Sequence, residues 1–344
     1  MNFPGGINCP PYETADGFLT TTEGCSHNTC LFCTYFKDQK YRKCSIEEIE
    51  SDIREIPRTF GAPKRIFLQG ADGYSADYDV LMRAAELLHK YVPSVQTLGG
   101  YARIDSFTDK TEEQLRNMAA AGFANPYIGV ESGDDVVLKR INKGYTAAQA
   151  REQLEKIDAS GLPYVVNFLN GAGGNGYGPA NAQRTAALYD GLHPTMVNTS
   201  MLTLVPGTPL YRAVEKGLYV ESTEMEKLEE IHELVRCLTN NTFFMNEHAS
   251  NLFHVQCQLP DAREELLASI QKFMEDSDEK ELRKYRERIT RAFLIGGTHE
   301  LQRSHLQAAC RGEYLSAAHH RRMHPQQLFL LQYVSGDPRS GCCR

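Results

Sequence analysis

The chain has 344 residues, of which 41% are hydrophobic and 24% are charged, and both values are close to globular averages. This composition excludes collagen-like, coiled-coil and wholly disordered chains, and the length allows one large α/β domain or two smaller ones. No apolar run reaches the roughly 18–20 residues that span a bilayer. The net charge of −7 argues against a general nucleic-acid-binding surface.

Ten cysteines are the most unusual feature of the composition. A chain of this size does not need disulfides for stability, and its N-terminus lacks the basic-then-apolar order of a secretory signal. In the reducing cytoplasm, clustered cysteines more often bind metal or carry out redox chemistry. We therefore expect a cytoplasmic enzyme that has no membrane partner and does not act on nucleic acid.

Short apolar strands alternate with helices from residue 18 to residue 204. The helices carry start and stop signals, such as Ser45 before the first helix and Gly161 at the end of the fourth. The predicted strands are 18–22, 65–68, 95–98, 127–130, 164–169 and 197–204, and the predicted helices are 46–56, 79–91, 111–121, 147–160 and 180–191. This alternation predicts an α/β fold, a partial (β/α)6 barrel of the TIM type, whose ligands bind at the carboxyl ends of the strands.

The pattern changes after residue 206, and periodicity is lost from Gly296 onward. Three helices with charged faces are predicted over 223–238, 262–273 and 279–293. The predicted parts are an N-terminal segment (1–14), a barrel core (15–210), a C-terminal helical extension (211–295) and a poorly structured tail (296–344). The tail contains the vicinal pair Cys342 and Cys343, which ligates one metal poorly, so we expect no second cluster there.

The strongest motif follows the first predicted strand, where Cys25, Cys30 and Cys33 fall within nine residues. Three thiolates on one short loop can bind three irons of a cubane cluster, and no fourth cysteine nearby completes the set. One iron then stays open to a further ligand. A zinc site that includes His27 is the alternative, although zinc usually takes a second ligand pair from elsewhere in the chain.

The spacing Cys-x4-Cys-x2-Cys after a first strand, with Phe32 directly before the last cysteine, resembles the radical S-adenosylmethionine (SAM) superfamily. The commonest spacing in that family has one residue fewer between the first two cysteines, which implies an altered loop path here. The resemblance covers residues 15–260. It implies a [4Fe–4S] cluster held by Cys25, Cys30 and Cys33, with SAM bound at the open iron.

Further segments resemble the SAM-binding segments of the superfamily. Gly70, Ala71 and Asp72 stand at the glycine turn whose backbone holds the SAM amino group, with Ala71 in place of the usual second glycine. The segments 128–133 and 138–146 are similar to the fourth-strand region of the branch that contains Elp3-like and coproporphyrinogen-dehydrogenase-like (HemN-like) enzymes. These likenesses place the chain in an uncharacterised subgroup of that branch.

The resemblance implies individual contacts to SAM. The residue at the position of Glu131 contacts SAM, the basic residue at Lys143 neutralises its carboxylate, and Asn167 binds the ribose hydroxyls where the family usually has Asp. Phe32 stacks near the adenine or belongs to the core. Structural roles are the alternatives: a strand-end carboxylate for Glu131, a helix-end charge for Lys143 and a turn amide for Asn167.

Together these likenesses imply a radical SAM enzyme. A reduced cluster cleaves SAM to methionine and a 5′-deoxyadenosyl radical, which abstracts hydrogen from a small-molecule or peptide substrate. A one-electron donor of the flavodoxin or ferredoxin type is the implied protein partner. The alternative is an iron–sulfur or zinc-binding module that does not cleave SAM. The branch also suggests tRNA modification, against which the acidic charge counts, and heme chemistry.

Overall fold

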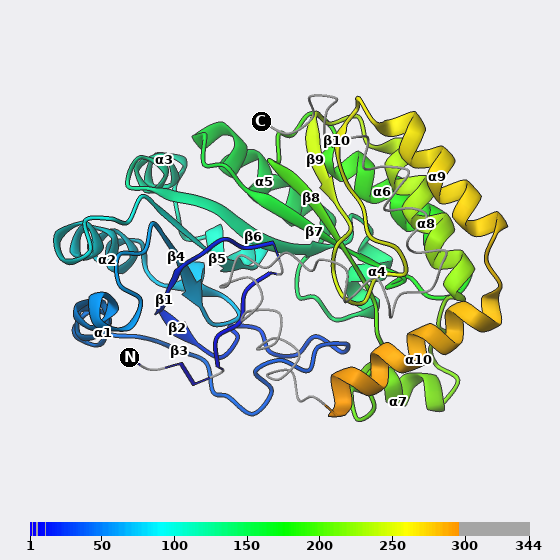
Figure 1. Cartoon of the computed structure of the whole chain (residues 1–344), viewed down its shortest axis with the longest axis horizontal. Helices are drawn as coiled ribbons and strands as arrows, with labels where there is room; N and C mark the ends of the chain where they lie inside the picture. The colour runs from blue at the N-terminus through cyan, green and yellow to red at the C-terminus, as the bar shows by residue number, and fades with distance from the viewer. Residues whose placement is uncertain (2, 5, 11, 296–344) are drawn as a thin grey trace. The chain divides into compact units, whose positions relative to one another are not determined.

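The computed structural model describes residues 1–295 except residues 2, 5 and 11 (Figure 1). Within these residues an eight-stranded sheet has the order β1-β4-β5-β6-β7-β8-β9-β10, and β2 pairs with β3 in a separate two-stranded sheet. The strands are β1 (Gly17–Thr20), β2 (Thr22–Glu23), β3 (Arg42–Lys43), β4 (Arg65–Gln69), β5 (Thr97–Ala102), β6 (Phe123–Glu131), β7 (Val165–Asn170), β8 (Met196–Met201), β9 (Thr242–Met245) and β10 (Gln256–Leu259). The helices are α1 (Ile46–Thr59), α2 (Tyr78–Tyr91), α3 (Glu112–Ala120), α4 (Asp135–Arg140), α5 (Ala147–Ser160), α6 (Gly178–Tyr189), α7 (Pro209–Glu215), α8 (Glu224–Cys237), α9 (Arg263–Glu275) and α10 (Glu279–Ile295), with 3-10 turns η1 (Gly73–Ser75) and η2 (Ile104–Phe107).

The described residues form two compact units. The first unit consists of Met1–Glu131, Leu138–Asn167 and Leu192–Met196, and the second consists of Ser132–Val137, Phe168–Gly191 and the residues from Val197 onward. Every residue that the sequence predicted to hold the cluster or SAM lies in the first unit. The predicted site therefore lies within the first unit.

Parallel strands form the centre of the first unit. β1 pairs with β4, β4 with β5 and β5 with β6, all in parallel. Successive side chains point to opposite faces of a strand, so Leu68 and Leu98 share the face that carries the buried aliphatic core. The opposite face carries Phe67, Tyr101 and Tyr127, whose rings contact one another edge to face. These parallel strands and the helices beside them confirm the predicted α/β class (Figure 1).

The helix ends follow the signals in the sequence. Ser45 caps α1: its hydroxyl accepts a hydrogen bond from the Glu48 amide at 3.3 Å, and the Glu48 carboxylate accepts one from the Ser45 amide. Thr146 caps α5 in the same way. Gly161 ends α5 with a φ of +77°, a left-handed conformation that glycine adopts without steric cost. α5 therefore covers the predicted residues 147–160.

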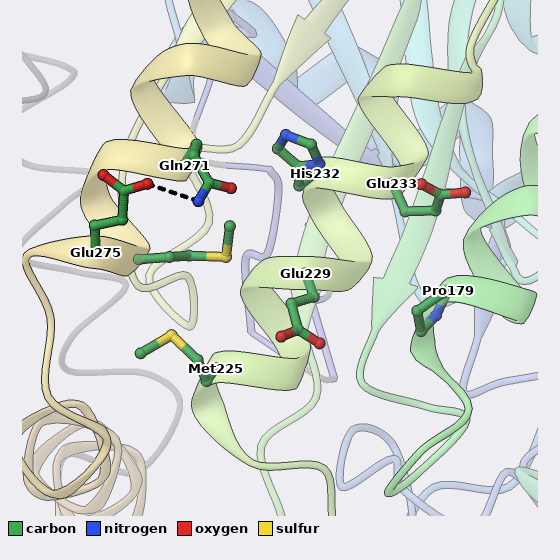
Figure 2. A pocket seen from close by; sticks show the side chains of 8 residues that line it. Pro179, Met225, Glu229, His232, Glu233, Gln271 and Glu275 are labelled. Atoms are coloured by element: carbon green, nitrogen blue, oxygen red, sulfur yellow. Dashed lines mark hydrogen bonds between the residues drawn. The ribbon is translucent and has the colours of Figure 1, made fainter.

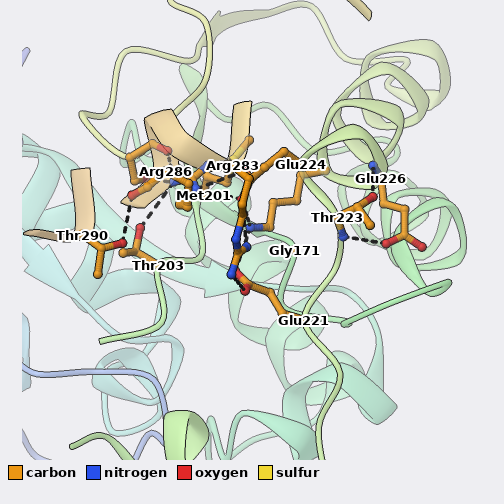
Figure 3. A network of polar contacts seen from close by, with 12 residues as sticks. Gly171, Met201, Thr203, Glu221, Thr223, Glu224, Glu226, Arg283, Arg286 and Thr290 are labelled. Carbon is orange, nitrogen blue, oxygen red and sulfur yellow. Dashed lines mark hydrogen bonds and ion pairs between the residues drawn. The ribbon is translucent and has the colours of Figure 1, made fainter. Parts of the chain in front are cut away.

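In the second unit, a network of buried charges joins α10 to the N-terminal end of α8 (Figure 3). The Lys227 ammonium donates to Glu221 and Glu224 at 3.0 Å each, and the Arg286 guanidinium of α10 donates to Glu224 at 2.9 Å. The Glu279 carboxylate accepts the backbone amide of Glu224 at 2.9 Å, which satisfies a donor that a helix start leaves free.

The region 211–295, predicted to be helical, also contains two strands. β9 pairs antiparallel with β10, and Thr242 stands opposite Leu259. None of the helices in the described part of the chain is both long and apolar enough to cross a bilayer. The predicted tail, 296–344, lies outside the described residues.

Candidate functional site

The loop after β2 carries three free cysteines: Cys25, Cys30 and Cys33. The loop is folded back on itself by Asn28, which has a φ of +46° and whose side chain donates to the Phe36 carbonyl at 3.0 Å. The Lys37 ammonium donates to the Asn28 carbonyl at 2.9 Å and to the Cys30 carbonyl at 3.2 Å. Local hydrogen bonds thus fix the backbone at Asn28 and at the second cysteine, Cys30.

The donor set of this loop suits an iron–sulfur cluster. Burial raises the pKa of the Cys33 thiol, and the neighbouring Cys30 and Cys25 thiols raise it further. The Cys33 thiol is therefore near both of the other cysteines. In the described part of the chain, no three His, Cys, Asp or Glu side chains converge on one metal ion. A cubane cluster needs no such convergence, because each thiolate binds a different iron.

The cysteine loop rests on the segment 141–144. The Asn142 amide donates to the Thr29 carbonyl at 2.9 Å, and the His27 Nε2 lies 2.7 Å from the Asn142 carbonyl. A Cβ atom at Gly144, which has a φ of +94°, would lie 2.5 Å from the His27 ring. His27, a ligand in the zinc alternative, is thus engaged by backbone, and the same segment carries Lys143.

The glycine turn after β4 lies against the start of the cysteine loop. Gly70 has a φ of +97°, and a Cβ atom there would lie 2.6 Å from the Thr22 carbonyl, so only glycine fits. The next amide, that of Ala71, donates to the Gly24 carbonyl at 3.2 Å. The expected glycine turn and the first cysteine are therefore neighbours in space.

Asp72, the last residue of that turn, is fully buried. One of its carboxylate oxygens accepts the Ser26 hydroxyl at 2.5 Å, and the other accepts the Ser106 hydroxyl. Burial raises the pKa of Asp72, and these two hydroxyls oppose the shift. Both side-chain oxygens thus have protein partners, one of which lies next to Cys25.

Glu131, Lys143 and Asn167 come together at the end of β6. Glu131 has a φ of +66°, which is rare for a residue other than glycine and is typical of functional sites. Its carboxylate accepts the Lys143 ammonium at 2.9 Å and the Asn167 amide at 2.7 Å, and the Tyr127 hydroxyl donates to Asn167 at 2.6 Å. Burial lowers the pKa of Lys143, but the Glu131 charge outweighs it, so the ammonium is held charged.

Three residues that support this group were missed by the sequence prediction of the site. A Cβ atom at Gly129 would lie 2.7 Å from the Glu131 carboxylate, so glycine leaves the room that the ion pair occupies. The Tyr145 hydroxyl donates to the Gly129 carbonyl at 2.6 Å, and Tyr127 anchors Asn167. The alternation of β6, which puts residues 127, 129 and 131 on one face, is the sequence signal that identifies Tyr127 and Gly129.

Arg103 contacts the segment of Lys143, and Phe32, which the sequence predicted near the adenine or in the core, lies on the cysteine loop. The Arg103 guanidinium is buried, pairs with Asp105 at 2.8 Å and donates to the Lys143 carbonyl at 2.9 Å. Arg103 therefore supports the segment that carries Lys143. Phe32 is half-buried on the cysteine loop.

Comparison with known proteins identifies the domain that carries this site. The family model described as the radical SAM superfamily matches residues 19–187, which include all the predicted site residues. The chain therefore contains a radical SAM domain. It is therefore an enzyme, and its cofactors are a [4Fe–4S] cluster and SAM.

The curated relatives of this radical SAM protein include two tRNA methylthiotransferases. The chain is 26% identical over 161 residues to tRNA-2-methylthio-N(6)-dimethylallyladenosine synthase of Dehalococcoides mccartyi, which covers 45% of this chain and 37% of that protein. It is 24% identical over 240 residues to threonylcarbamoyladenosine tRNA methylthiotransferase MtaB of Thermotoga maritima, covering 65% of this chain and 53% of the relative. The chain thus spans about half or less of these relatives.

A solved structure is similar over more of the chain. The cobalamin-dependent S-adenosylmethionine radical enzyme OxsB, with aqua-cobalamin and S-adenosylmethionine bound, matches 92% of this chain and 58% of its own at 16% identity, with a TM-score of 0.49.

The second unit of this radical SAM protein contains a surface hollow of about 510 Å³ along α8 and α9 (Figure 2). It is lined by Pro179, Met225, Glu229, His232, Glu233, Gln271, Met274 and Glu275. The Gln271 amide donates to Glu275 at 2.9 Å across one side of it. None of the predicted cluster or SAM residues lines this hollow.

Proposed function

We propose that this enzyme cleaves SAM reductively to methionine and a 5′-deoxyadenosyl radical, which then takes a hydrogen atom from the substrate. The observation that carries the proposal is the buried group of Glu131, Lys143 and Asn167 at a strand end, on a segment that also contacts the cysteine loop. When bound, the reduced cluster supplies the electron that breaks a carbon–sulfur bond of SAM.

The residues of the chain have separate roles in this proposal. Cys25, Cys30 and Cys33 hold the cluster as thiolates. Lys143 offers a buried positive charge to the SAM carboxylate, and Glu131 keeps that charge from being unpaired in the absence of the carboxylate. Asn167 offers an uncharged amide to the ribose hydroxyls, and the backbone of Gly70 and Ala71 offers carbonyls to the SAM amino group, as the resemblance implies.

An aromatic wall excludes water from the same face of the sheet. The Tyr101 and Tyr127 rings lie 5.5 Å apart, and Tyr12 of the N-terminal segment lies 6.2 Å from Tyr127. The Asn8 amide donates to Gln69 at 2.8 Å, so the N-terminal segment also covers the end of β4. Excluding water strengthens the polar contacts inside such a site and protects a reactive intermediate.

Anaerobic reconstitution with iron and sulfide tests the proposal. We expect a brown protein that absorbs near 400 nm and releases 5′-deoxyadenosine from SAM after reduction with dithionite. Cys30→Ala should lose the cluster and this activity, whereas Cys237→Ala, which changes a cysteine on α8, should keep both. A colourless protein that binds one zinc, or a Cys30→Ala variant with a full complement of iron, would contradict the proposal and favour the metal-binding module.

We further propose a small-molecule or peptide substrate and a one-electron donor of the flavodoxin or ferredoxin type. Reduction by either donor in place of dithionite, followed as 5′-deoxyadenosine release, tests the electron partner. Membership of the Elp3-like and HemN-like branch also stays a prediction.

A second candidate function is methylthiolation of tRNA, the activity for which the two tRNA-modifying relatives are named. The net charge of −7 speaks against a large nucleic-acid substrate. Incubation of the reconstituted enzyme with unmodified tRNA, SAM, dithionite and sulfide as the sulfur source, followed by mass spectrometry of the digested nucleosides, decides between the two substrates. A methylthio-adenosine product would favour tRNA.

A further inference from the structure

Asp72 is a buried carboxylate whose partners point to the cluster rather than to SAM. Its side chain is fully buried, and its oxygens accept the hydroxyls of Ser26 and Ser106. Each carboxylate oxygen thus accepts a hydrogen bond from a serine hydroxyl rather than from a basic side chain. A buried carboxylate without hydrogen-bond partners is strongly destabilising, so this arrangement is constrained.

The residues on both sides of Cys25 are tied to the turn that contains Asp72. Ser26 donates to the Asp72 side chain at 2.5 Å, and the Gly24 carbonyl accepts the Ala71 amide at 3.2 Å. The Thr22 hydroxyl donates to the Asp72 carbonyl at 2.9 Å, which extends the contact to β2. Cys25 is therefore held at two points, one residue before it and one residue after it.

The other two cysteines are held differently. Lys37 donates to the Cys30 carbonyl at 3.2 Å, and the neighbours of Cys30, Thr29 and Leu31, bond to the segment 141–144. The Cys33 sulfur donates to the Tyr35 carbonyl at 3.9 Å. Cys25 instead depends on contacts with the glycine turn, some 46 residues further along the chain. The position of its thiolate thus depends on a residue that is distant in sequence.

From these contacts we infer that Asp72 is a positioning residue for the cluster: its carboxylate fixes Ser26 and so sets the position of the Cys25 thiolate. This role differs from the SAM contact expected from the sequence, and it rests on the proposed assignment of Cys25 as a cluster ligand. Partners that orient metal ligands typically contribute 10–100-fold to metal affinity.

Ser26 offers a clean test because it is exposed, so removing its hydroxyl leaves no cavity. We expect Ser26→Ala to raise the rate at which a ferrous-iron chelator strips the reconstituted protein by about tenfold. Ser26→Thr keeps a hydroxyl and should restore the rate of the unmodified protein. Asp72→Ala should resemble Ser26→Ala, and the double variant should be no worse than Asp72→Ala, because both remove the same contact.

Electron paramagnetic resonance of the dithionite-reduced cluster without SAM gives a second readout. Ser26→Ala and Asp72→Ala should share an altered line shape, and Asp79→Asn, an exposed carboxylate on α2, should keep the original one. A Ser26→Ala variant that loses iron at the original rate would overturn the inference. So would an Asp72→Ala variant that weakens SAM binding with an unchanged spectrum.

The failure of this inference is distinguishable from failure of the proposed function. A Cys25→Ala variant that keeps its full cluster would remove Cys25 from the ligand set and thus overturn the proposed site itself. A Cys25→Ala variant without cluster, together with a Ser26→Ala variant that behaves like the original, would overturn only the role of Asp72.

Discussion

The Glu131–Lys143 pair shows how much a single contact can tell about function. The two residues are 8% and 5% exposed, so most of their charge is removed from water. Burying charges costs several kcal/mol per ion, and the left-handed backbone at Glu131 adds about 1–3 kcal/mol. Such a buried pair marks a candidate ligand site, which supports the proposed contacts of Glu131 and Lys143 with SAM.

At the residue scale, Lys143→Met tests the SAM contact. Loss of a charge-assisted bond to a carboxylate corresponds to about 1.5–3 kcal/mol, so we expect SAM to bind at least tenfold more weakly. The iron content should not change, because Lys143 does not hold the cluster. Equilibrium dialysis of the reconstituted protein measures the affinity, with Lys139→Met, an exposed lysine on α4, as the control. If Lys143→Met bound SAM with unchanged affinity, the role of Lys143 would be structural only.

A second residue-scale prediction concerns pH. Glu230 on α8 is fully buried and accepts the Asn181 amide at 2.7 Å and the Gly171 amide at 2.6 Å. Burial raises its pKa from the usual 4.5 to about 7, against the pull of these two bonds and of the Lys227 charge. The folded state therefore binds this proton more tightly than the unfolded state, and stability falls as the pH rises from about 4.5 through 7.

Replacing the carboxyl group should remove this dependence. Each unit of pKa shift corresponds to about 1.4 kcal/mol, so from pH 5 to pH 8 we expect the protein to lose about 2 kcal/mol relative to Glu230→Gln. Urea unfolding at each pH measures the difference in free energy of unfolding. If the free energy of unfolding changed with pH in the same way in both proteins, Glu230 would not titrate in this range.

At the scale of elements, the sequence predicts helices better than short strands. Helix ends carry local signals: Ser45 marked the start of α1 and Gly161 the end of α5, whereas α1 runs to Thr59, three residues beyond its predicted end. β9 and β10 are four residues each, and their pairing is set by partners distant in sequence, so no local pattern reveals them. β6 begins at Phe123, four residues before the predicted start, because Pro126 argues against a strand in isolation.

In the candidate site, too, the residues with a local sequence pattern were predicted and those held by tertiary contacts were not. Cysteine spacing and the strand-end segments identified the cluster loop, Glu131, Lys143 and Asn167, because these residues recur in a recognisable order. The support from Tyr145 and Asn142 was not predictable, since each contacts its partner through a loop whose path is set by tertiary packing. The sequence thus pointed to the residues proposed to bind the cluster and SAM, and the structure shows which residues support them.

The prediction for a single element concerns Arg286, which attaches α10. It is 2% exposed on α10 and pairs with Glu224, the first residue of α8. Removing one partner of a buried pair costs about 3–5 kcal/mol, so Arg286→Ala should destabilise the attachment of α10. We expect faster hydrogen exchange across residues 279–291, with Lys284→Ala, an exposed position on the same helix, unchanged. Equal exchange in the two variants would show that apolar packing alone holds α10.

At the scale of the whole molecule, residues far apart in sequence build one site within the first unit. The cysteine loop, the glycine turn and the strand-end group span residues 24–167, and all of them belong to that unit. Ligands that bind only the folded state stabilise it by mass action, about 2.7 kcal/mol at a concentration one hundred times the Kd. SAM should therefore stabilise the reconstituted protein.

Hydrogen exchange shows where this stabilisation acts. SAM should slow exchange in peptides that cover residues 24–33, 127–145 and 165–167, because the proposed contacts lie there, and the effect should disappear in Lys143→Met. Protein without its cluster should respond far less, because one anchor for SAM is then missing. Protection confined to α8 and α9, which line the 510 Å³ hollow, would instead place SAM in the second unit and refute the proposed site.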